Sequence, residues 1–380
     1  MRRTISVIFA AGKIGTLSLP NRLVRSATAE RMADADGRPT PQLLSLYQGL
    51  ASGGVGLIIT GHMYVHPSGK ASPEMTGIHS DELIPALAEL TAAVHCKGGH
   101  IVAQLNHGGM QCSPEAVTGT LAPSAIAAPF LRQPAREITV SEINDLIQAF
   151  SQAARRAREA GFDGVQIHGA HGYLISQFLS PFSNHRSDEW GGELQARTRF
   201  LRAVCQAIRE QVGPRYPVLI KLGVRDGIAG GLTAEEGLSV VAELESMGLD
   251  AVEVSGGIGG VRNLNVRPNI RAGVDEAYFR PLAHQARKVT RLPILLVGGL
   301  RSRRMMEDVL ASGDADFVSL SRPLLCEPDL PKRMLLDLQE QSSCISANRC
   351  WVDRQGEGIA CKCRIGVAHR KARRKGSVSS

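Results

Sequence analysis

Two histidines and a tyrosine stand close together at the start of the segment 168–192, HGAHGYLISQFLSPFSNHRSDEWGG. The short apolar run 161–167 before them reads as a buried strand, so His168, His171 and Tyr173 fall where a strand ends and a loop begins. The spacing of His168 and His171 allows two ring N–H groups to meet one carbonyl oxygen. Fixed donors of this kind stabilise negative charge that develops on such an oxygen. The segment therefore predicts chemistry on a small carbonyl compound.

The same two histidines would also suit a zinc ion, because imidazole is a common zinc ligand. A catalytic zinc needs a third protein ligand, and none is evident near this segment. We therefore expect no metal at His168 and His171.

Short β-branched runs that alternate with helix-length amphipathic stretches must position these residues. Strands are expected at 22–27, 55–61, 100–107, 164–169, 218–223, 251–256, 294–299 and 317–322. Between them lie helical patterns such as 141–161, which we expect to start at Ser141 with Glu142 in the first turn. Eight uninterrupted units of this kind predict an α/β fold of the (β/α)8 TIM barrel type, with functional residues at the carboxyl ends of the strands. The longer loops, 107–134 and 180–193, both follow strands and should cover that face.

A doubly wound sheet is the alternative architecture. Its first turn should carry the pattern G-x-G-x-x-G, which cradles a dinucleotide. Here the first expected strand runs instead into SATAE, residues 26–30. The barrel is therefore the better reading.

Composition is that of an ordinary globular protein, with 43% hydrophobic residues, 21% charged residues and 40 glycines in 380. No apolar run reaches the 18 residues that would suggest a membrane span. The first 15 residues resemble a signal peptide only faintly, since Lys13 and Gly15 break the apolar stretch early. Four cysteines lie singly along the expected barrel: Cys96, Cys112, Cys205 and Cys326. This spacing is typical of free thiols and not of a secreted disulfide framework, so it points to the cytoplasm.

The net charge of +8 raises the question of a nucleic-acid partner. Much of that charge lies in the end of the chain, AHRKARRKGSVSS, where a basic run that ends in small polar residues is typical of a solvated tail. We therefore expect a small-molecule substrate and neither a membrane nor a nucleic acid as partner. A homo-oligomer is left open.

The segment 168–192 closely resembles the signature of the old yellow enzyme family, the FMN-dependent ene-reductases. It carries H-x-A-H-G-Y-L, then Q-F-L-S-P, then N-x-R-x-D-x-x-G-G, and many fixed positions make such a match specific. The resemblance runs from Ile14 to Arg322, nearly the whole expected barrel. It implies a TIM barrel that binds FMN and takes hydride from NAD(P)H.

A flavin needs donors for its ring edge, an anion site for its phosphate, and a positive charge near N1 and O2 that stabilises the reduced ring. Gln104 matches the family's glutamine at the pyrimidine edge, and Lys221 matches its Arg or Lys near N1 and O2. A lysine in so apolar a strand would be costly without an anionic partner. The resemblance also implies a phosphate site formed by Gly298, Gly299, Ser321 and Arg322. It further implies that Ser26, Ala27 and Thr28 lie along the flavin ring. Gly61 is expected to let the backbone approach the ring closely.

On the substrate side, the resemblance implies that His168 and His171 bind the activating carbonyl and that Tyr173 delivers a proton to the α-carbon. These three are the expected catalytic residues. Arg186, Asp188, Gly191 and Gly192 are expected to fix the shape of their loop.

Cys344, Cys350, Cys361 and Cys363 resemble the iron–sulfur segment of the larger branch that includes 2,4-dienoyl-CoA reductase and trimethylamine dehydrogenase. That segment begins C-x-x-C, but its second cysteine is replaced here by Ala347, and the next gap is one residue short. Three thiolates with Cys363 as an improvised fourth would be the ligands of a cluster. We interpret the segment as a decayed cluster site and expect no bound cluster.

The sequence thus predicts an FMN-binding TIM barrel over residues 1–340, a cysteine-containing segment over 341–368 and a basic tail over 369–380. The expected activity is hydride transfer from NAD(P)H through flavin N5 to an activated alkene such as an enone. One alternative is amine or N-methyl oxidation of the trimethylamine dehydrogenase type, though aromatic residues are only 4% of the chain. Another is an RNA-acting flavin barrel like dihydrouridine synthase, which the net positive charge of the chain suggests. The H-x-x-H-G-Y segment argues against it, because it belongs to reductases of small molecules.

Overall fold

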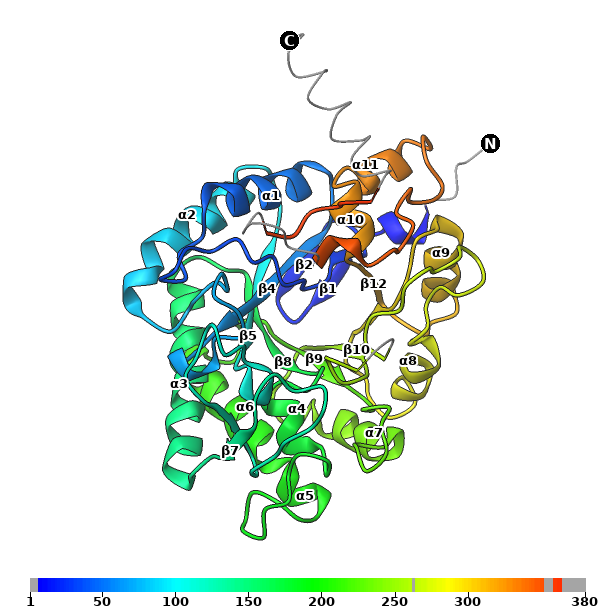
Figure 1. The fold of residues 1–380 in the computed structure, drawn as a ribbon. Coiled ribbons are helices and arrows are strands. Elements are labelled where there is room, and N and C mark those ends of the chain that lie inside the picture. The colour runs from blue at the N-terminus through cyan, green and yellow to red at the C-terminus, as the bar shows by residue number, and fades with distance from the viewer. Residues whose placement is uncertain (1–5, 262–263, 352–357, 364–380) are drawn as a thin grey trace.

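Eight parallel strands close into a barrel in the computed structural model, which describes residues 6–261, 264–351 and 358–363 (Figure 1). Going round the barrel, the order is β10-β11-β12-β3-β4-β5-β8-β9. The barrel strands are β3 (Leu23–Arg25), β4 (Leu57–Tyr64), β5 (Ile101–Asn106), β8 (Gly164–Gly169), β9 (Val218–Gly223), β10 (Ala251–Ser255), β11 (Ile294–Val297) and β12 (Phe317–Leu320). Every one of the eight expected strands is confirmed, and so is the TIM barrel.

Helices follow the strands and surround the barrel (Figure 1). The α-helices are α1 (Pro41–Ser52), α2 (Ile84–His95), α3 (Val140–Glu159), α4 (Leu174–Leu179), α5 (Leu194–Arg197), α6 (Arg199–Val212), α7 (Ala234–Glu243), α8 (Arg280–Ala286), α9 (Arg303–Ala311), α10 (Arg322–Cys326) and α11 (Leu330–Leu335). Single 3-10 turns lie at η1 (Val7–Phe9), η2 (Pro67–Gly69), η3 (Asp81–Leu83), η4 (Gly109–Gln111) and η5 (Arg349–Trp351). No helix in the described ranges is long and apolar enough to cross a membrane.

The start of α3 differs from the expectation. Its N-cap is Thr139 and not Ser141: the Thr139 hydroxyl accepts from the Glu142 amide, while the Glu142 carboxylate accepts from the Thr139 amide. This reciprocal pair satisfies two backbone donors that the first turn leaves free, so the helix begins two residues earlier than expected.

An antiparallel hairpin closes the amino-terminal end of the barrel. It consists of β1 (Gly12–Ile14) and β2 (Leu17–Leu19). Ile14 and Leu19 are buried in an apolar cluster with strand residues inside the barrel, among them Val102 on β5 and Phe317 on β12. Because this end is plugged, the barrel can admit a ligand only from the carboxyl ends of its strands.

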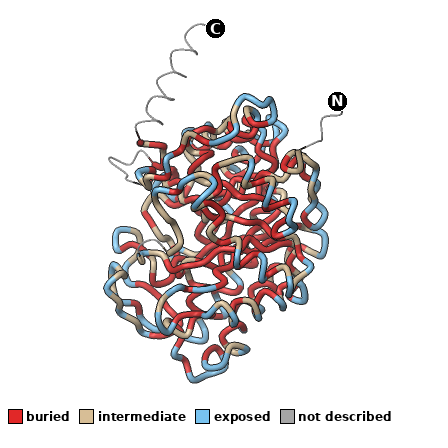
Figure 2. Tube along the Cα trace, turned by 90° about the vertical axis from the view of Figure 1, so that its right-hand side faces the viewer, coloured by how far each residue is buried: buried red, intermediate tan, exposed pale blue. Residues whose placement is uncertain are grey.

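The larger core lies between the barrel and the helices, and the buried chain runs through the centre of the molecule in Figure 2. The amphipathic helices α3 and α6 pack against each other there, with Phe150 and Phe200 fully buried. These two clusters hold the strands rigidly, so the residues at the strand ends are positioned precisely enough for chemistry.

Candidate active site

An open cavity lies at the carboxyl ends of the barrel strands. Each of the eight strands supplies a lining residue on the strand or directly after it: Ser26, His62, Gln104, His168, Lys221, Ser255, Val297 and Ser319. A cavity at this end of a TIM barrel, lined by every barrel strand, is where a cofactor or substrate binds.

Most of the residues predicted from the sequence meet in this cavity. They are Ser26, Ala27, Thr28, Gln104, His168, His171, Tyr173, Lys221, Gly299, Ser321 and Arg322. Residues almost 300 positions apart, such as Ser26 and Arg322, are brought together because β3 and β12 are neighbours in the closed barrel.

Gly61 and Gly298 are not among the cavity-lining residues. The amide of Gly61 donates to Glu30 Oε1 (2.9 Å) and Tyr47 Oη (3.0 Å), and a Cβ at this glycine would lie 1.6 Å from Glu30 Oε2. The close approach seen at Gly61 is that of Glu30, a buried carboxylate paired with Arg25. Gly298, at a φ of 136°, packs instead against Tyr278 and Phe279.

Four rings form one wall of the cavity. The ring of Tyr173 lies 4.8 Å from that of His168 and 5.1 Å from that of His62, and the His168 ring lies 5.3 Å from that of His171, all between ring centroids. His62, on β4, did not stand out in the sequence. It faces the cavity because the β4–β5 register shifts between Ile59 and His62, which breaks the simple alternation of the strand.

Burial is the main influence on the charge of this wall. Together with smaller effects of nearby cations, Arg31 and Lys221 for His62 and Lys221 for His171, burial lowers the pKa of His62 to about 4 and that of His171 to about 3. The pKa of His168 is also well below its usual value, first through burial and then through His171, His62 and Lys221. Burial raises the pKa of Tyr173 to about 12. At neutral pH the wall thus presents neutral imidazoles and a protonated phenol.

The two predicted carbonyl-binding histidines are held differently. His171 shares a hydrogen bond with Ser255 (Nε2 to Oγ, 2.7 Å), while Nδ1 of His168 is buried and has no hydrogen-bond partner in the described part of the chain. A buried polar atom without a partner in a cavity indicates a ligand. His171 also has a φ of 63°, unusual for a residue with a side chain, and its carbonyl oxygen accepts from the Gly259 amide at 2.9 Å. Such strain is typical of functional turns.

The floor of the cavity is a buried polar network. Nζ of Lys221 donates to Ser26 Oγ (2.8 Å), and this hydroxyl donates to Glu253 Oε1 (2.7 Å). On the other side, Gln104 Nε2 donates to Gln166 Oε1 (2.7 Å), and Gln166 Nε2 donates to Glu253 Oε2 (2.9 Å). Lys221 and Gln104, the two expected flavin contacts, are therefore connected through Glu253.

At the other end of the cavity, Arg322 begins α10 and is buried. Its Nη1 donates to the carbonyl oxygens of Arg267 (2.8 Å) and Ser346 (3.3 Å) and to the side chain of Asn348. Among the described residues this leaves Nε and Nη2 as donors for a ligand. Thr28 and Ser321 share a hydrogen bond between their hydroxyls (2.8 Å) beside it. The combination suits an anion such as a phosphate.

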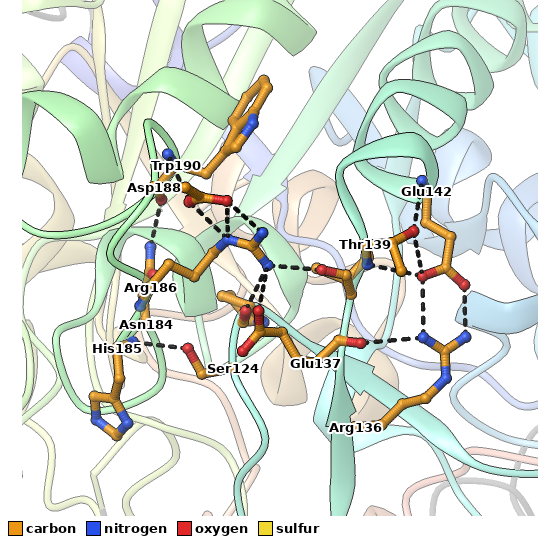
Figure 3. Close-up of polar contacts among 12 residues, drawn as sticks. Ser124, Arg136, Glu137, Thr139, Glu142, Asn184, His185, Arg186, Asp188 and Trp190 are labelled. Carbon is orange, nitrogen blue, oxygen red and sulfur yellow. Dashed lines mark hydrogen bonds and ion pairs between the residues drawn. The ribbon is translucent and has the colours of Figure 1, made fainter.

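The later part of the loop after β8, residues 184–192, is held in shape by Arg186 (Figure 3). None of these residues is among those that line the cavity. The guanidinium of Arg186 is bidentate to Asp188 and donates to the carbonyl oxygens of Pro123 (3.0 Å) and Ile138 (2.6 Å). A Cβ at Gly191 would lie 2.5 Å from the Arg186 carbonyl oxygen. Arg186 therefore ties this loop to the loop that follows β5.

The C-terminal cysteines lie together with one that the sequence analysis had treated as isolated. Cys326, at the end of α10, packs with Cys344, Cys361 and Cys363, and Sγ of Cys361 is 3.4 Å from Sγ of Cys363. Cys326 is thus part of the C-terminal cysteine cluster. The sequence could not show this, because a helix and a loop separate Cys326 from the other cysteines in the chain. In the described ranges, no group of three or more His, Cys, Asp or Glu side chains has a geometry that could hold a metal ion. The predicted basic tail, 369–380, lies outside the described residues.

Comparison with known proteins gives a consistent family. Residues 7–341 match the profile of the NADH:flavin oxidoreductase / NADH oxidase family. An NADH oxidase of Thermoanaerobacter brockii is 36% identical over 94% of this chain and 55% of its own length. An NADPH dehydrogenase of Clostridium acetobutylicum is 36% identical over 84% of this chain and 92% of its own. The solved structure of an old yellow enzyme homologue from Zymomonas mobilis superimposes with a TM-score of 0.76 at 28% identity, over 88% of this chain and 94% of that one. The chain spans about half the length of the first two curated relatives that it matches.

Proposed function

The chain belongs to the NADH:flavin oxidoreductase / NADH oxidase family, and we propose that it is an FMN-dependent reductase that passes hydride from NAD(P)H to an activated alkene of the enone type. The observation that carries the proposal is one cavity with a lysine and glutamine floor, an arginine at one end and a wall of His168, His171 and Tyr173. The related NADPH dehydrogenase and the superimposed old yellow enzyme homologue support it.

The residues present fit FMN. Lys221 and Gln104 would hold the pyrimidine edge, and Arg322 with Ser321 and the backbone at Gly299 would hold the phosphate. The donors of Arg322 that have no partner in the described structure call for an anionic ligand. The ammonium of Lys221 is already paired with Glu253 and Ser26 and has a third hydrogen for an electron-rich ring edge. Bound FMN would supply the hydride-transfer chemistry that no side chain can perform.

The histidine wall would bind and polarise the substrate. Neutral His168 and His171 donate ring N–H groups to the carbonyl oxygen conjugated with the alkene, so the charge that reaches this oxygen as hydride arrives at the β-carbon is stabilised. Their lowered pKa values keep both imidazoles neutral at pH 7, so the binding of a neutral carbonyl does not require a buried cation.

Tyr173 would complete the reaction with a proton from its hydroxyl to the α-carbon. Hydride and proton together saturate the double bond, and a proton from solvent then restores the phenol. Because burial raises the pKa of Tyr173 to about 12, the group is held in the protonated form that a donor needs.

A cationic amine is a poorer fit as substrate. No aspartate or glutamate is among the described residues that line the cavity, whereas Lys221 and Arg322 are. An ammonium group would meet these two cations with no carboxylate in the described lining to pair it, because Glu253 lies beneath the floor and already pairs with Lys221. This argues against amine oxidation as the main activity.

The proposal is tested with the purified protein under anaerobic conditions. We expect a bound flavin in the visible spectrum, its bleaching by NADH or NADPH, and its rapid reoxidation by cyclohexenone with formation of cyclohexanone. A protein with no flavin, or with a flavin that trimethylamine reduces and cyclohexenone does not oxidise, would overturn the proposal.

A further inference from the structure

Glu253 is a fully buried carboxylate at the centre of the barrel floor. It is 0% exposed and lies on β10, where it is the register partner of Lys221 on β9. Its Oε2 is 3.3 Å from Lys221 Nζ and accepts from Gln166, and its Oε1 accepts from Ser26. Among the described residues, its partners Lys221, Gln166 and Ser26 all belong to the cavity floor.

A buried carboxylate in this position is energetically unfavourable compared with the branched apolar side chains that can fill the interior of such a barrel. Desolvation of an ion pair commonly offsets most of its Coulomb attraction, so packing alone does not explain Glu253. Its value must lie in what it does to the groups above it. Those groups are Lys221 directly, and Gln104 through the amide of Gln166.

We propose that Glu253 sets the reduction potential of the bound flavin by offsetting part of the charge of Lys221 and fixing its direction. The inference rests on the proposed function, in which FMN lies against Lys221. A cation near the ring favours the electron-rich reduced state, and a carboxylate behind that cation weakens the effect. Glu253 therefore keeps the flavin a stronger reductant than Lys221 alone would allow.

The geometry gives Glu253 a positioning role as well. Lys221, Ser26 and Glu253 form a closed triangle of contacts of 2.8, 2.7 and 3.3 Å, which restricts a flexible lysine to one direction. Gln104 donates one amide hydrogen to Gln166, which fixes the orientation of its side chain. The other amide hydrogen and the amide oxygen of Gln104 are then directed toward the cofactor. Glu253 touches neither cofactor nor substrate and acts through these residues.

The test compares Lys221→Arg with the double variant Lys221→Arg/Glu253→Gln. Arginine stays protonated in both proteins, so removal of the carboxylate changes only one charge. We expect the two-electron reduction equilibrium of bound FMN to shift at least tenfold toward the reduced state, which equals a rise of about 30 mV in potential, measured by spectroelectrochemistry. Glu253→Asp in the Lys221→Arg background keeps the charge and is the matched control, with a smaller shift expected.

A potential that is unchanged or falls on Glu253→Gln would overturn the inference, as would an equal shift with Glu253→Asp. FMN affinity, measured by titration of the apoprotein, separates this outcome from failure of the proposed function. If the parent protein does not bind FMN, the proposed function fails. If all variants bind FMN and the potential does not move, only the role of Glu253 fails.

Discussion

His168 on β8 and Lys221 on β9 are register partners, so an imidazole of the cavity wall stands beside the ammonium of the cavity floor. Burial is the main cause of the low pKa of His168, and His171, His62 and the Lys221 cation lower it further. One strand pair thus joins the part of the cavity that suits a flavin edge to the part that suits a carbonyl oxygen. The predictions below test these two parts separately.

Replacement of both His168 and His171 by alanine should abolish most carbonyl activation. Loss of such donors costs on the order of 3 kcal/mol or more of transition-state stabilisation, which is a drop of more than a hundredfold in kcat/KM for cyclohexenone. Binding of a phenol, followed through the flavin spectrum, should weaken in parallel. His95→Ala, at an exposed site on α2, is the matched control. Enone reduction at the parent rate would exclude the two histidines from the site.

Tyr173→Phe should separate the two halves of the reaction. The phenylalanine ring can keep its contacts with His62 and His168 while the proton donor is lost. We expect the rate of flavin reduction by NAD(P)H to stay within twofold of the parent rate, and enone-dependent reoxidation to slow about a hundredfold or more. Stopped-flow measurement of each half-reaction decides it. Equal slowing of both halves would indicate a packing role for Tyr173.

Arg322→Leu should weaken the binding of FMN and leave that of riboflavin almost unchanged. A charge-assisted hydrogen bond to phosphate is among the stronger polar contacts, so we expect FMN affinity to fall at least tenfold. Because Arg322 also holds the carbonyl oxygens of Arg267 and Ser346, riboflavin serves as the internal control. An equal loss for both ligands would show that the arginine supports the loop and not the phosphate.

Acid should destabilise the protein through its buried histidines. The folded-state pKa of His62 is about 4, below the ordinary value of 6.5. Between pH 6.5 and pH 4, therefore, His62 is protonated in the unfolded chain and remains neutral in the folded protein. Stability is therefore fully present above pH 6.5 and falls as the pH drops toward 4, with about 2 kcal/mol lost at pH 5 from this histidine. Urea unfolding at pH 7 and pH 5 measures the loss.

His62→Gln is the matched comparison, since it removes this titration and leaves the other groups in place. The loss of unfolding free energy between pH 7 and pH 5 should be smaller in the variant by about 2 kcal/mol. Identical losses in the two proteins would show that His62 is protonated in the folded state at pH 5.

The strands and most of the cavity could be predicted because both depend on local rules. Each strand is a short β-branched run, and polar residues toward the carboxyl ends of such runs, among them Gln104 and Lys221, meet at one end of a parallel barrel. Gln166 and Glu253 could have been found by the same argument that identified Lys221, since each is a polar residue inside an apolar strand.

Other features depend on tertiary structure that a single sequence does not reveal. His62 faces the cavity only because of a register shift in β4, and Gly61 is required by Glu30, which lies far from it in the chain. Cys326 joins the other thiols because α10 and α11 turn the chain back on itself. In each case the deciding contact is with a residue on another element.

The pairing of β12 with β3 has a consequence for the order of events during synthesis. The first barrel strand, β3 (Leu23–Arg25), pairs with the last, β12 (Phe317–Leu320), which follows it by almost 300 residues. The barrel can therefore close only after β12 has been synthesised. Until then both strands are open edges, which are prone to aggregation, and such long-range pairing slows folding. Arg322 follows the last strand in the chain, so the phosphate-binding end that we propose can form only after β12 has been synthesised.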